Sequence, residues 1–178
     1  MSKTKWTIDP VHSEIQFKVK HLMITTVTGH FKEVNATVES EEPDFSDADV
    51  YFEAKTASLS TNDEKRDDHL RSGDFFDAEK YPVLKFQSTS LKKRDDAGVY
   101  NVTGNLTIKD VTKPATLVAE FGGIQKDPWG NHKAGFSVHG KINRKDWGLN
   151  WNAALESGGV LVSDEVRIFC ELQFTREV

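Results

Sequence analysis

The sequence predicts an all-β fold: an eight-stranded antiparallel barrel with one short helical insert. Three observations lead to it. Apolar and polar residues alternate along most of the chain, turn-forming residues separate the alternating segments, and only residues 61–72 carry helix signals. Alternation with a period of two gives each strand one dry face and one wet face. The 178 residues fit a single domain, residues 1–178, with one core.

Eight segments are expected to be strands, and the first reads Ile-Gln-Phe-Lys-Val-Lys-His. Eight strands paired in up-and-down order can close on themselves and remove both sheet edges. At this number the interior holds either packed side chains or one small ligand. An open two-sheet sandwich is the competing architecture. The segments are 15–21, 34–38, 50–54, 84–86, 100–108, 117–121, 134–142 and 166–174, and Asp96-Ala97-Gly98 is a hairpin signal.

Residues 61–72 interrupt the alternation and predict the helical insert. Thr61-x-x-Glu64 is a capping-box pattern at its start, and Gly73 is placed to end it. Leu70 is the single apolar residue of the segment, so the helix should lie on the surface. Phe75 and Phe76 follow at once. Together they predict a plug or lid over one end of the barrel.

Two glycines fall inside strand patterns, Gly104 and Gly140. A glycine there indicates a bulge or a bend where the sheet curls. The functional alternative is a gap in the wall that leaves room for a ligand.

Composition and charge exclude several classes of protein. A hydrophobic share of 37% and a charged share of 29% are too apolar for disorder and too polar for a membrane protein. The net charge of −5 argues against nucleic acid and anionic membranes as partners. No apolar run approaches the length of a spanning helix, and no signal peptide is visible. We therefore expect a cytoplasmic protein with no membrane span.

The sequence shows no catalytic constellation. The patterns of metal sites, nucleophile elbows, P-loops and dinucleotide-binding turns are absent, so neither metal nor cofactor is expected. We expect His21 and His139 to point inward with the apolar residues of their strands. Cys170 lies in the apolar phase of the last strand and is expected to be a buried small hydrophobe. Asp9-x-x-His12-Ser13 suits a turn closed by side-chain-to-backbone bonds.

Several motifs resemble those of the YceI-like, or polyisoprenoid-binding, family. They run in order from about Trp6 to Phe174, and one departs from the family pattern, with Trp147 where Phe is common before Gly148. The motifs are Trp6-Thr7-Ile8-Asp9-Pro10-Val11-His12-Ser13, Gly29-x-Phe31, Arg66-x-x-His69-Leu70-x-Ser72-x-Asp74-Phe75-Phe76, Tyr81-Pro82-x-x-x-Phe86, Gly104-x-Leu106-Thr107-Ile108-x-Asp110-x-Thr112-x-Pro114 and Arg144-Lys145-Asp146-Trp147-Gly148.

The resemblance implies an extended, lipocalin-like barrel whose hydrophobic tunnel holds an isoprenoid chain, such as a polyprenol or a quinone tail. Many members of the family are secreted to the periplasm. Because no signal peptide is visible in this sequence, the chain looks like a cytoplasmic branch. A homodimer is plausible for the family. The resemblance implies no catalytic residues.

The alternation predicts which residues line the tunnel. Any one of these residues could be an ordinary core residue, and it is the group that favours a lined tunnel. Its members are Phe17, Val19, Phe52, Phe86, Leu106, Ile108, Phe121, Phe136, Val138 and Ile168. Phe31, Phe75 and Phe76 are expected near a mouth, where His69 and Arg66 would tie the helix to the rim or contact a polar head group.

The leading hypothesis is a carrier, store or sensor of an isoprenoid-type lipid. The alternative is an enzyme, an isomerase or hydrolase of a lipophilic substrate, with His21 or His139 as the acid/base group. It requires an inward histidine with a carboxylate partner. A third possibility is a partner-binding scaffold, which would need an exposed apolar patch.

Overall fold

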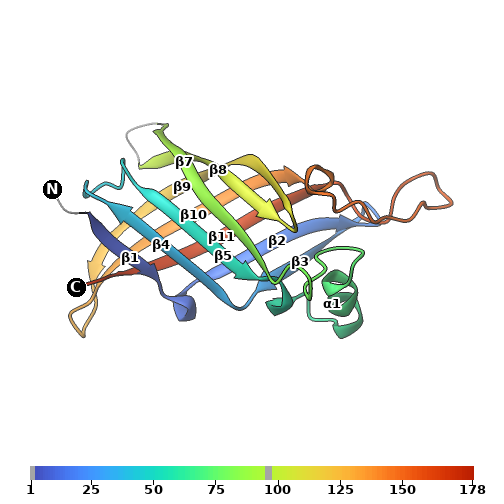
Figure 1. The fold of residues 1–178 in the computed structure, drawn as a ribbon, viewed down its shortest axis with the longest axis horizontal. Helices are drawn as coiled ribbons and strands as arrows, with labels where there is room; N and C mark the ends of the chain where they lie inside the picture. The colour runs from blue at the N-terminus through green and yellow to red at the C-terminus, as the bar shows by residue number, and fades with distance from the viewer. Residues whose placement is uncertain (1–2, 95–97) are drawn as a thin grey trace.

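The computed structural model describes residues 3–94 and 98–178, which form an elongated antiparallel barrel (Figure 1). The start of β1 and the C-terminus lie at one end, and the helix α1 lies at the other. The strands are β1 (Thr4–Ile8), β2 (Glu14–His21), β3 (Thr25–Phe31), β4 (Val34–Ser40), β5 (Asp49–Lys55), β6 (Leu59–Ser60), β7 (Val83–Lys93), β8 (Val99–Ile108), β9 (Val111–Lys126), β10 (His132–Asn143) and β11 (Glu165–Arg176). The helical elements are α1 (Glu64–Arg71) and three 3₁₀ turns, η1 (Pro10–His12), η2 (Thr56–Ser58) and η3 (Arg144–Trp147).

Eight strands close the barrel in the order β1-β4-β5-β7-β8-β9-β10-β11, and β1 pairs with β11 to complete the ring. Every pair is antiparallel, and neighbours in the ring from β4 to β11 follow one another along the chain, except that β6 and α1 lie between β5 and β7. The predicted eight-stranded barrel is therefore confirmed, and the sandwich is excluded. The hairpin signal Asp96-Ala97-Gly98 falls between β7 and β8, which pair with each other, and residues 95–97 lie outside the described part of the chain.

The strands β1 and β2 are two halves of one bent strand. Both pair with β11, β1 with its last residues and β2 with its middle. The bend is η1, where the Asp9 carboxylate accepts hydrogen bonds from the Val11 backbone N–H and bonds the His12 ring, as the turn prediction required. The bond from His12 lowers the pKa of Asp9, helped by Lys133 at 3.2 Å.

The strands β3 and β4 form the return path, with β3 on β2 and β4 on β1. Sequence analysis missed β1 and β3. Beyond the ring, β2, β3 and the two-residue β6 extend the wall at the end that carries α1.

The helix α1 is shorter than the predicted 61–72, and its capping differs. Asp63 is the N-cap, and its carboxylate accepts from the Arg66 backbone N–H. Thr61 is instead buried, and both its backbone N–H and its hydroxyl donate to Asp67. The capping-box prediction was wrong because Asp63, nearer the first turn, offers the better cap acceptor. Ser72, in extended conformation, ends the helix rather than Gly73.

Within the described residues, α1 is the single α-helix, and no helix could cross a bilayer.

At both Gly104 and Gly140 a neighbouring residue lies close to the backbone. A Cβ on Gly104 would lie 2.6 Å from the Phe86 ring and 2.5 Å from the Gln87 carbonyl oxygen. One on Gly140 would lie 2.4 Å from a Leu117 methyl. A neighbouring side chain thus occupies the space above each glycine, and β7 has a register shift beside Gly104, between Ser88 and Ser90. The register shift supports a bulge beside Gly104, whereas the pairing of Gly140 with β11 continues without a shift. The space above each glycine is occupied, so neither leaves a gap.

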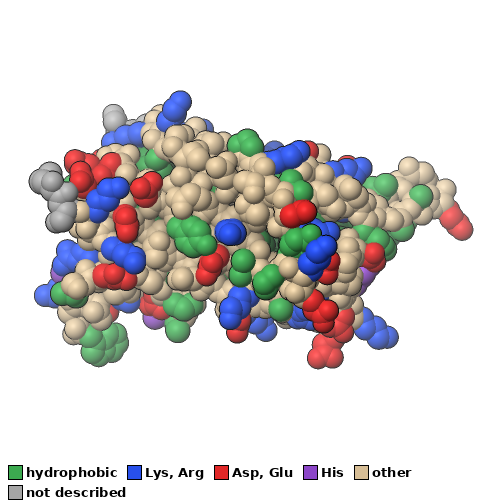
Figure 2. All heavy atoms as spheres, in the orientation of Figure 1, with side chains coloured by type: hydrophobic (Ala, Val, Ile, Leu, Met, Phe, Trp, Pro, Cys, Tyr) green, Lys and Arg blue, Asp and Glu red, His purple; other side chains and the backbone are tan. Residues whose placement is uncertain are grey.

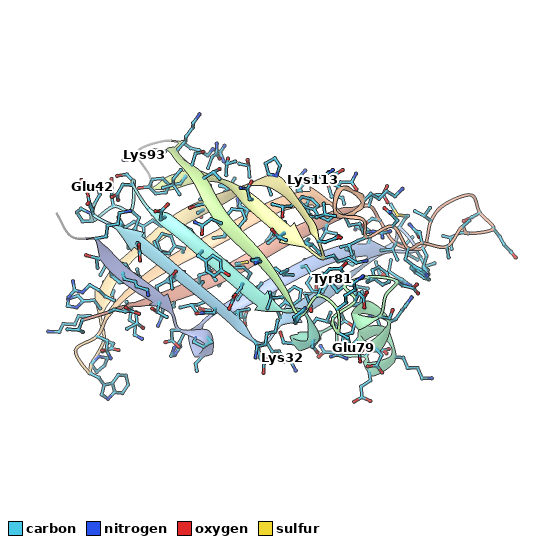
Figure 3. The ribbon with its side chains drawn as sticks, viewed as in Figure 1. Lys32, Glu42, Glu79, Tyr81, Lys93 and Lys113 are labelled. Carbon is cyan, nitrogen blue, oxygen red and sulfur yellow. The ribbon has the colours of Figure 1, made fainter. Side chains whose placement is uncertain are left out.

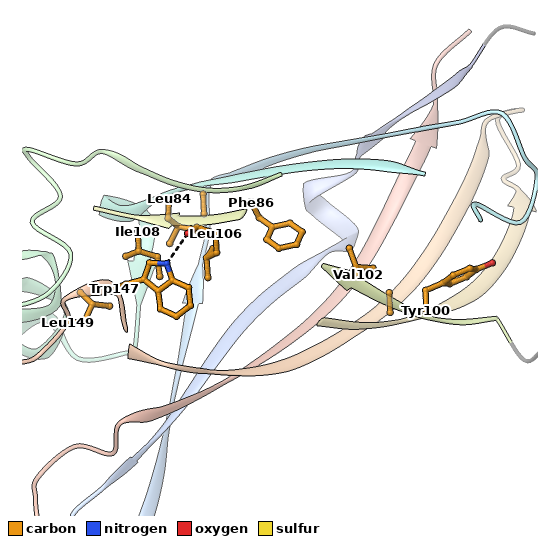
Figure 4. Packing of buried hydrophobic residues seen from close by; sticks show 10 residues of the cluster. Leu84, Phe86, Tyr100, Val102, Leu106, Ile108, Trp147 and Leu149 are labelled. Carbon is orange, nitrogen blue, oxygen red and sulfur yellow. Dashed lines mark hydrogen bonds between the residues drawn. The ribbon is translucent and has the colours of Figure 1, made fainter. Parts of the chain in front are cut away.

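The core lies along the inner face of the sheet. Figure 4 shows one cluster from Tyr100 to Leu149, with the Trp147 indole donating to the Leu106 carbonyl at 2.8 Å. A second cluster gathers around Trp6, Phe45 and Phe174. Between the two clusters the inner face surrounds an open space, described next.

An apolar cavity inside the barrel

A cavity of about 650 Å³ runs inside the barrel. It extends from Phe45, Tyr100 and Phe174 to His21, Arg66 and Leu161. Figure 3 marks the two ends of the molecule: Glu42 and Lys93 lie at the end with the start of β1 and the C-terminus, and Glu79 and Tyr81 lie beside α1. We call the first the closed end and the second the mouth. The volume is within the range of pockets that hold drug-sized ligands.

The predicted tunnel residues, with one exception, lie in the cavity wall. The exception is Phe121, which is not part of the wall. Its ring packs on Phe45 at 5.1 Å and on Phe136 at 5.3 Å, measured between ring centroids. Those in the wall are Phe17, Val19, Phe52, Phe86, Leu106, Ile108, Phe136, Val138 and Ile168.

The closed end is sealed by Phe45, which the loop 41–48 inserts into the barrel. Only 3% of Phe45 is exposed, and its backbone has a φ of +63°. A bulky residue in the left-handed region is strained, and it persists only where its surroundings hold it. Here the ring makes edge contacts with Trp6, Phe121 and Phe136 at centroid distances of 5.1–5.4 Å. Such contacts add to the stabilisation that burial itself gives.

Hydrogen bonds hold the loop 41–48 in place. The Asp47 carboxylate accepts from the Ser40 hydroxyl at 2.5 Å and from the backbone N–H groups of Glu41 and Glu42 at 2.9 and 3.1 Å. These bonds, that from Ser40 first, lower the pKa of Asp47 to about 2. Across the opening the Tyr100 hydroxyl donates to the Asp44 carbonyl at 2.6 Å. Burial raises the pKa of Tyr100, so the hydroxyl stays a donor.

The mouth is lined by aromatic rings from strands, from α1 and from two loops. All five predicted mouth residues lie in its wall: Phe31, Phe75, Phe76, His69 and Arg66. The ring of His69 stands edge-on to Phe75 at 5.1 Å and to Trp151 at 4.5 Å. In a second set of contacts, Phe31 packs on both Phe17 and Phe76. Two aromatic groups therefore frame the entrance.

The polar side chains that face the cavity gather at the mouth. The His69 Nε2 bonds the Asp74 carboxylate at 2.8 Å. Arg66 donates to the hydroxyl and the carbonyl of Thr61, each at 2.6 Å, which ties α1 to the chain before it. The deeper wall, apart from Gln16, the Tyr100 hydroxyl and the Cys170 thiol, carries apolar side chains. A ligand with one polar end would match this distribution.

Arg144 is a buried cation in the wall near the mouth, with 3% exposed. Its guanidinium donates to the carbonyls of Ser163 and Trp151 at 2.9 Å, and also to those of Leu149 and Val162. The guanidinium N–H groups are thus occupied by carbonyls of the loop 148–163. The nearest carboxylate oxygen of Asp164 lies 4.0 Å from a guanidinium nitrogen. Burial lowers the pKa of Arg144, and the charge is compensated by the carbonyl dipoles. Arg144 therefore organises the loop rather than offering a binding charge.

The predicted inward orientation is right for His21 and wrong for His139. His21 lies in the cavity wall, but His139 is exposed on the outer face. The reason is parity, since Val138 and Ile142 point inward and position 139 belongs to the other face. In the described chain no ion pair joins His21 to a carboxylate. Neither histidine therefore forms the dyad that the enzyme hypothesis requires.

Cys170 is a wall residue with an inert thiol. Burial raises the pKa of Cys170 to about 12, which keeps the thiol protonated at neutral pH. Among residues 3–94 and 98–178, no cluster of three or more His, Cys, Asp or Glu side chains could hold a metal ion.

Sequence analysis missed residues that shape both ends. Phe45 lies between the predicted strands 34–38 and 50–54, and Trp151 and Leu161 lie in a loop without alternation. A large apolar residue isolated between Asp44 and Ser46 was the available signal for Phe45, since turns seldom need one. Nothing in the local pattern around Trp151 marks it as a wall residue.

The comparisons with known proteins agree with this architecture. The YceI-like domain model matches residues 6–174, nearly the whole chain. The chain belongs to the YceI-like family. A UPF0312 protein of Staphylococcus aureus (strain N315) is 36% identical over 173 residues, which cover 97% of this chain and 98% of the relative. The recognition from sequence motifs is thereby confirmed.

Solved structures of the family have the same barrel. BcnA of Burkholderia cenocepacia matches with a TM-score of 0.79 and 25% identity, over 93% of this chain and 98% of that one. The YCEI protein of Campylobacter jejuni matches with a TM-score of 0.76 and 34% identity, over 89% and 90%. A polyisoprenoid binding domain from Saccharophagus degradans shares the fold, with a TM-score of 0.68 and 15% identity over 97% and 98%.

Proposed function

We propose that the barrel binds an isoprenoid-type lipid, a polyprenol or the tail of a quinone, as a carrier, store or sensor. The observation that carries the proposal is the cavity itself: a long apolar space, sealed by Phe45 at one end and edged with polar side chains at the other. An isoprenoid chain offers apolar surface along its length and a polar group at one end. Its shape and polarity match those of the cavity.

The energetics favour a ligand of this kind. Burial of apolar surface stabilises by roughly 0.8 kcal/mol per CH₂ group, so a chain of three or four isoprene units could contribute on the order of 10 kcal/mol before the costs of ordering it. Hydrogen bonds would contribute little in the deep cavity, because the wall offers few polar partners there. Affinity should therefore follow chain length rather than chain chemistry.

The polar end of the ligand would lie at the mouth. His69 bonds Asp74 through Nε2, which leaves Nδ1 on the other side of the ring for a hydroxyl or carbonyl of the ligand. Arg66, held by Thr61 and exposed at the rim, could contact the same group. The tail would then pass Phe17 and Phe31 and end near Phe45.

The fold relatives support the proposal at the level of ligand class. The Saccharophagus degradans domain, described as polyisoprenoid binding, is built on the same barrel. At 15% identity it supports a comparison of shape, and the apolar lining of the cavity supports a lipophilic ligand.

The test uses protein purified without detergent, followed by organic extraction and mass spectrometry. We expect a co-purified lipophile, and saturable uptake of an added polyprenol by the delipidated protein. The blocking variant is Val138→Trp, which fills the wall at mid-cavity, and the matched control is His139→Trp on the outer face of the same strand. Val138→Trp should weaken uptake by about tenfold or more, and His139→Trp should leave it unchanged.

Thermal unfolding accompanies the uptake assay. If the cavity is open space, Val138→Trp should fold with little loss of stability, because the indole enters a void rather than a packed core. Uptake that is equal in both variants, or absent from the native protein, would overturn the proposal.

A further inference from the structure

The turn between β2 and β3 combines a strained backbone with exposed apolar side chains. Leu22 and Met23 have φ angles of +54° and +60°, and the Ile24 N–H donates to the His21 carbonyl at 3.2 Å. Positive φ at both central residues is what a type I′ turn requires, and Asn-Gly is the sequence that meets it without strain. A Leu-Met pair costs conformational energy here and is only partly buried in return.

The same residues present their side chains to solvent. The exposed fractions are 38% for Leu22, 51% for Met23 and 77% for Ile24. Turn residues are ordinarily small or polar, for reasons of backbone geometry and hydrogen bonding. Three large apolar residues in sequence at a strained turn therefore serve something other than the fold. We call residues 22–24 the apolar tip.

The apolar tip is fixed beside the cavity mouth. The Leu22 N–H donates to the Leu161 carbonyl at 2.8 Å, and His21 pairs with Val162 in a β-bridge. These contacts join the tip to the loop 148–163, which Arg144 holds. Val160 of that loop is 40% exposed, and Figure 2 shows apolar atoms on the loop where it projects from the mouth end. His21 and Leu161 themselves line the cavity.

Cations surround the base of the apolar tip. Lys18, Lys20 and Arg167 line a surface hollow together with Met23, and Glu165 is the one carboxylate among its lining residues. Glu165 already pairs with Lys141 at 3.8 Å. This surplus of positive charge is local, since the whole chain carries −5. Charges near a docking surface act within about a Debye length, roughly 8–10 Å, so the local surplus outweighs the net charge there.

We propose that the apolar tip docks onto the surface of a lipid bilayer that contains anionic head groups. Leu22, Met23 and Ile24 would enter the boundary between head groups and acyl chains, and the neighbouring cations would contact lipid phosphates. Docking would hold the cavity mouth against the membrane. A lipophilic ligand could then pass between bilayer and barrel without crossing water.

Charge complementarity selects the bilayer over a second copy of the chain. A two-fold dimer through this surface would bring Lys18, Lys20 and Arg167 of one copy against the same cations of the other. An anionic lipid surface supplies the opposite charge and an apolar interior. The proposal concerns docking and does not depend on which lipid the cavity holds.

The experiment measures co-sedimentation with vesicles of phosphatidylcholine mixed with phosphatidylglycerol, and with vesicles of phosphatidylcholine alone. The test variant is Leu22→Asn/Met23→Gly, which supplies the residues that the turn prefers and removes two apolar groups. We expect partition to the mixed vesicles to fall by about tenfold or more while the melting temperature stays equal or rises. Trp129→Ser, at a turn of the closed end where the indole is 82% exposed, is the matched control and should not change partition.

A charge variant measures the electrostatic contribution to vesicle binding. Lys20→Gln should weaken binding to the mixed vesicles and reduce its dependence on salt, with little effect on phosphatidylcholine alone. Polyprenol uptake from solution by Leu22→Asn/Met23→Gly should match that of the native chain, so failure of docking is distinguishable from failure of the cavity to bind. The proposal is overturned if the native chain does not sediment with mixed vesicles, if the double variant binds them equally, or if the variant instead abolishes a dimer seen by sedimentation.

Discussion

The two ends of the barrel are built in opposite ways. At the closed end one inserted residue, Phe45, meets three aromatic rings, and a loop with its own hydrogen-bond network holds it there. At the mouth, rings such as Trp151 are half-buried and come from a loop that the cation of Arg144 holds in place. The closed end resembles a packed core. The mouth resembles a binding rim, with polar groups and exposed apolar residues.

The two ends differ in what they contribute: one to the stability of the fold, the other to the entry and release of a ligand. Deeply buried aromatic contacts oppose local opening, whereas half-buried loops open at lower cost. We therefore expect the closed end to stabilise the fold and the mouth to control the passage of ligand. Substitutions at the two ends should separate these properties.

The largest effect is expected from Phe45→Ala. The substitution removes the ring at the centre of the closed-end cluster and leaves a cavity, so it should lower the free energy of unfolding by about 3–5 kcal/mol. Urea denaturation followed by tryptophan fluorescence measures it. Phe169→Ala, at an outer-face residue that is 38% exposed, is the control, and the loss there should stay below about 1 kcal/mol. Equal losses in the two variants would contradict the packed closed end.

A smaller effect is expected from Arg144→Met. It removes the donors to four carbonyls of the loop 148–163, some of which can then turn to water, so we expect a loss of about 2–3 kcal/mol. Hydrogen exchange should speed up in residues 149–163 and stay slow around Phe45. Lys145→Met in the same 3₁₀ turn, where the side chain is half-exposed, is the matched control. Uniform exchange across both ends would refute the assignment of Arg144 to the mouth.

The smallest effect is a dependence on acid. The pKa of Asp47 is lowered to about 2 in the folded chain by the groups that hold the loop 41–48. The stabilisation is therefore fully present above the unfolded pKa, about 3.9, and is lost as the pH falls through about 2. Near-ultraviolet circular dichroism should report looser packing of Trp6 and Phe45 toward pH 2.

Asp47→Asn supplies the check on that assignment. It should weaken the closed-end signal at neutral pH and remove the part of the acid response due to Asp47. Glu42→Gln, at an exposed residue of the same loop, should behave like the native chain. An acid response that survives unchanged in Asp47→Asn would assign it to another group.

The barrel could be predicted from sequence because inward positions alternate with outward ones over long segments, as from Tyr100 to Ile108. β3 was missed because threonines dominate it, although Val27, Gly29 and Phe31 keep the alternation. His139 was misplaced by a single position, which in a strand exchanges the faces.

The ends of the barrel were harder to predict. The insertion of Phe45 depends on contacts with Trp6 and Phe136, which lie far away in the sequence. The helix insert and Phe75-Phe76 were expected over one end, where they lie, because caps and turns are local signals. The contacts of Phe45, by contrast, join residues far apart in the sequence, and such contacts produce no periodic pattern in the chain.

The most direct test of the central account is a crystal structure of the delipidated protein soaked or grown with a polyprenol. We expect continuous electron density along the cavity, with the chain end near Phe45 and Tyr100 and the hydroxyl near His69. Empty density with unchanged side chains, or a cavity filled by rearranged Phe17, Phe31 and Phe86, would contradict a lipid-binding barrel.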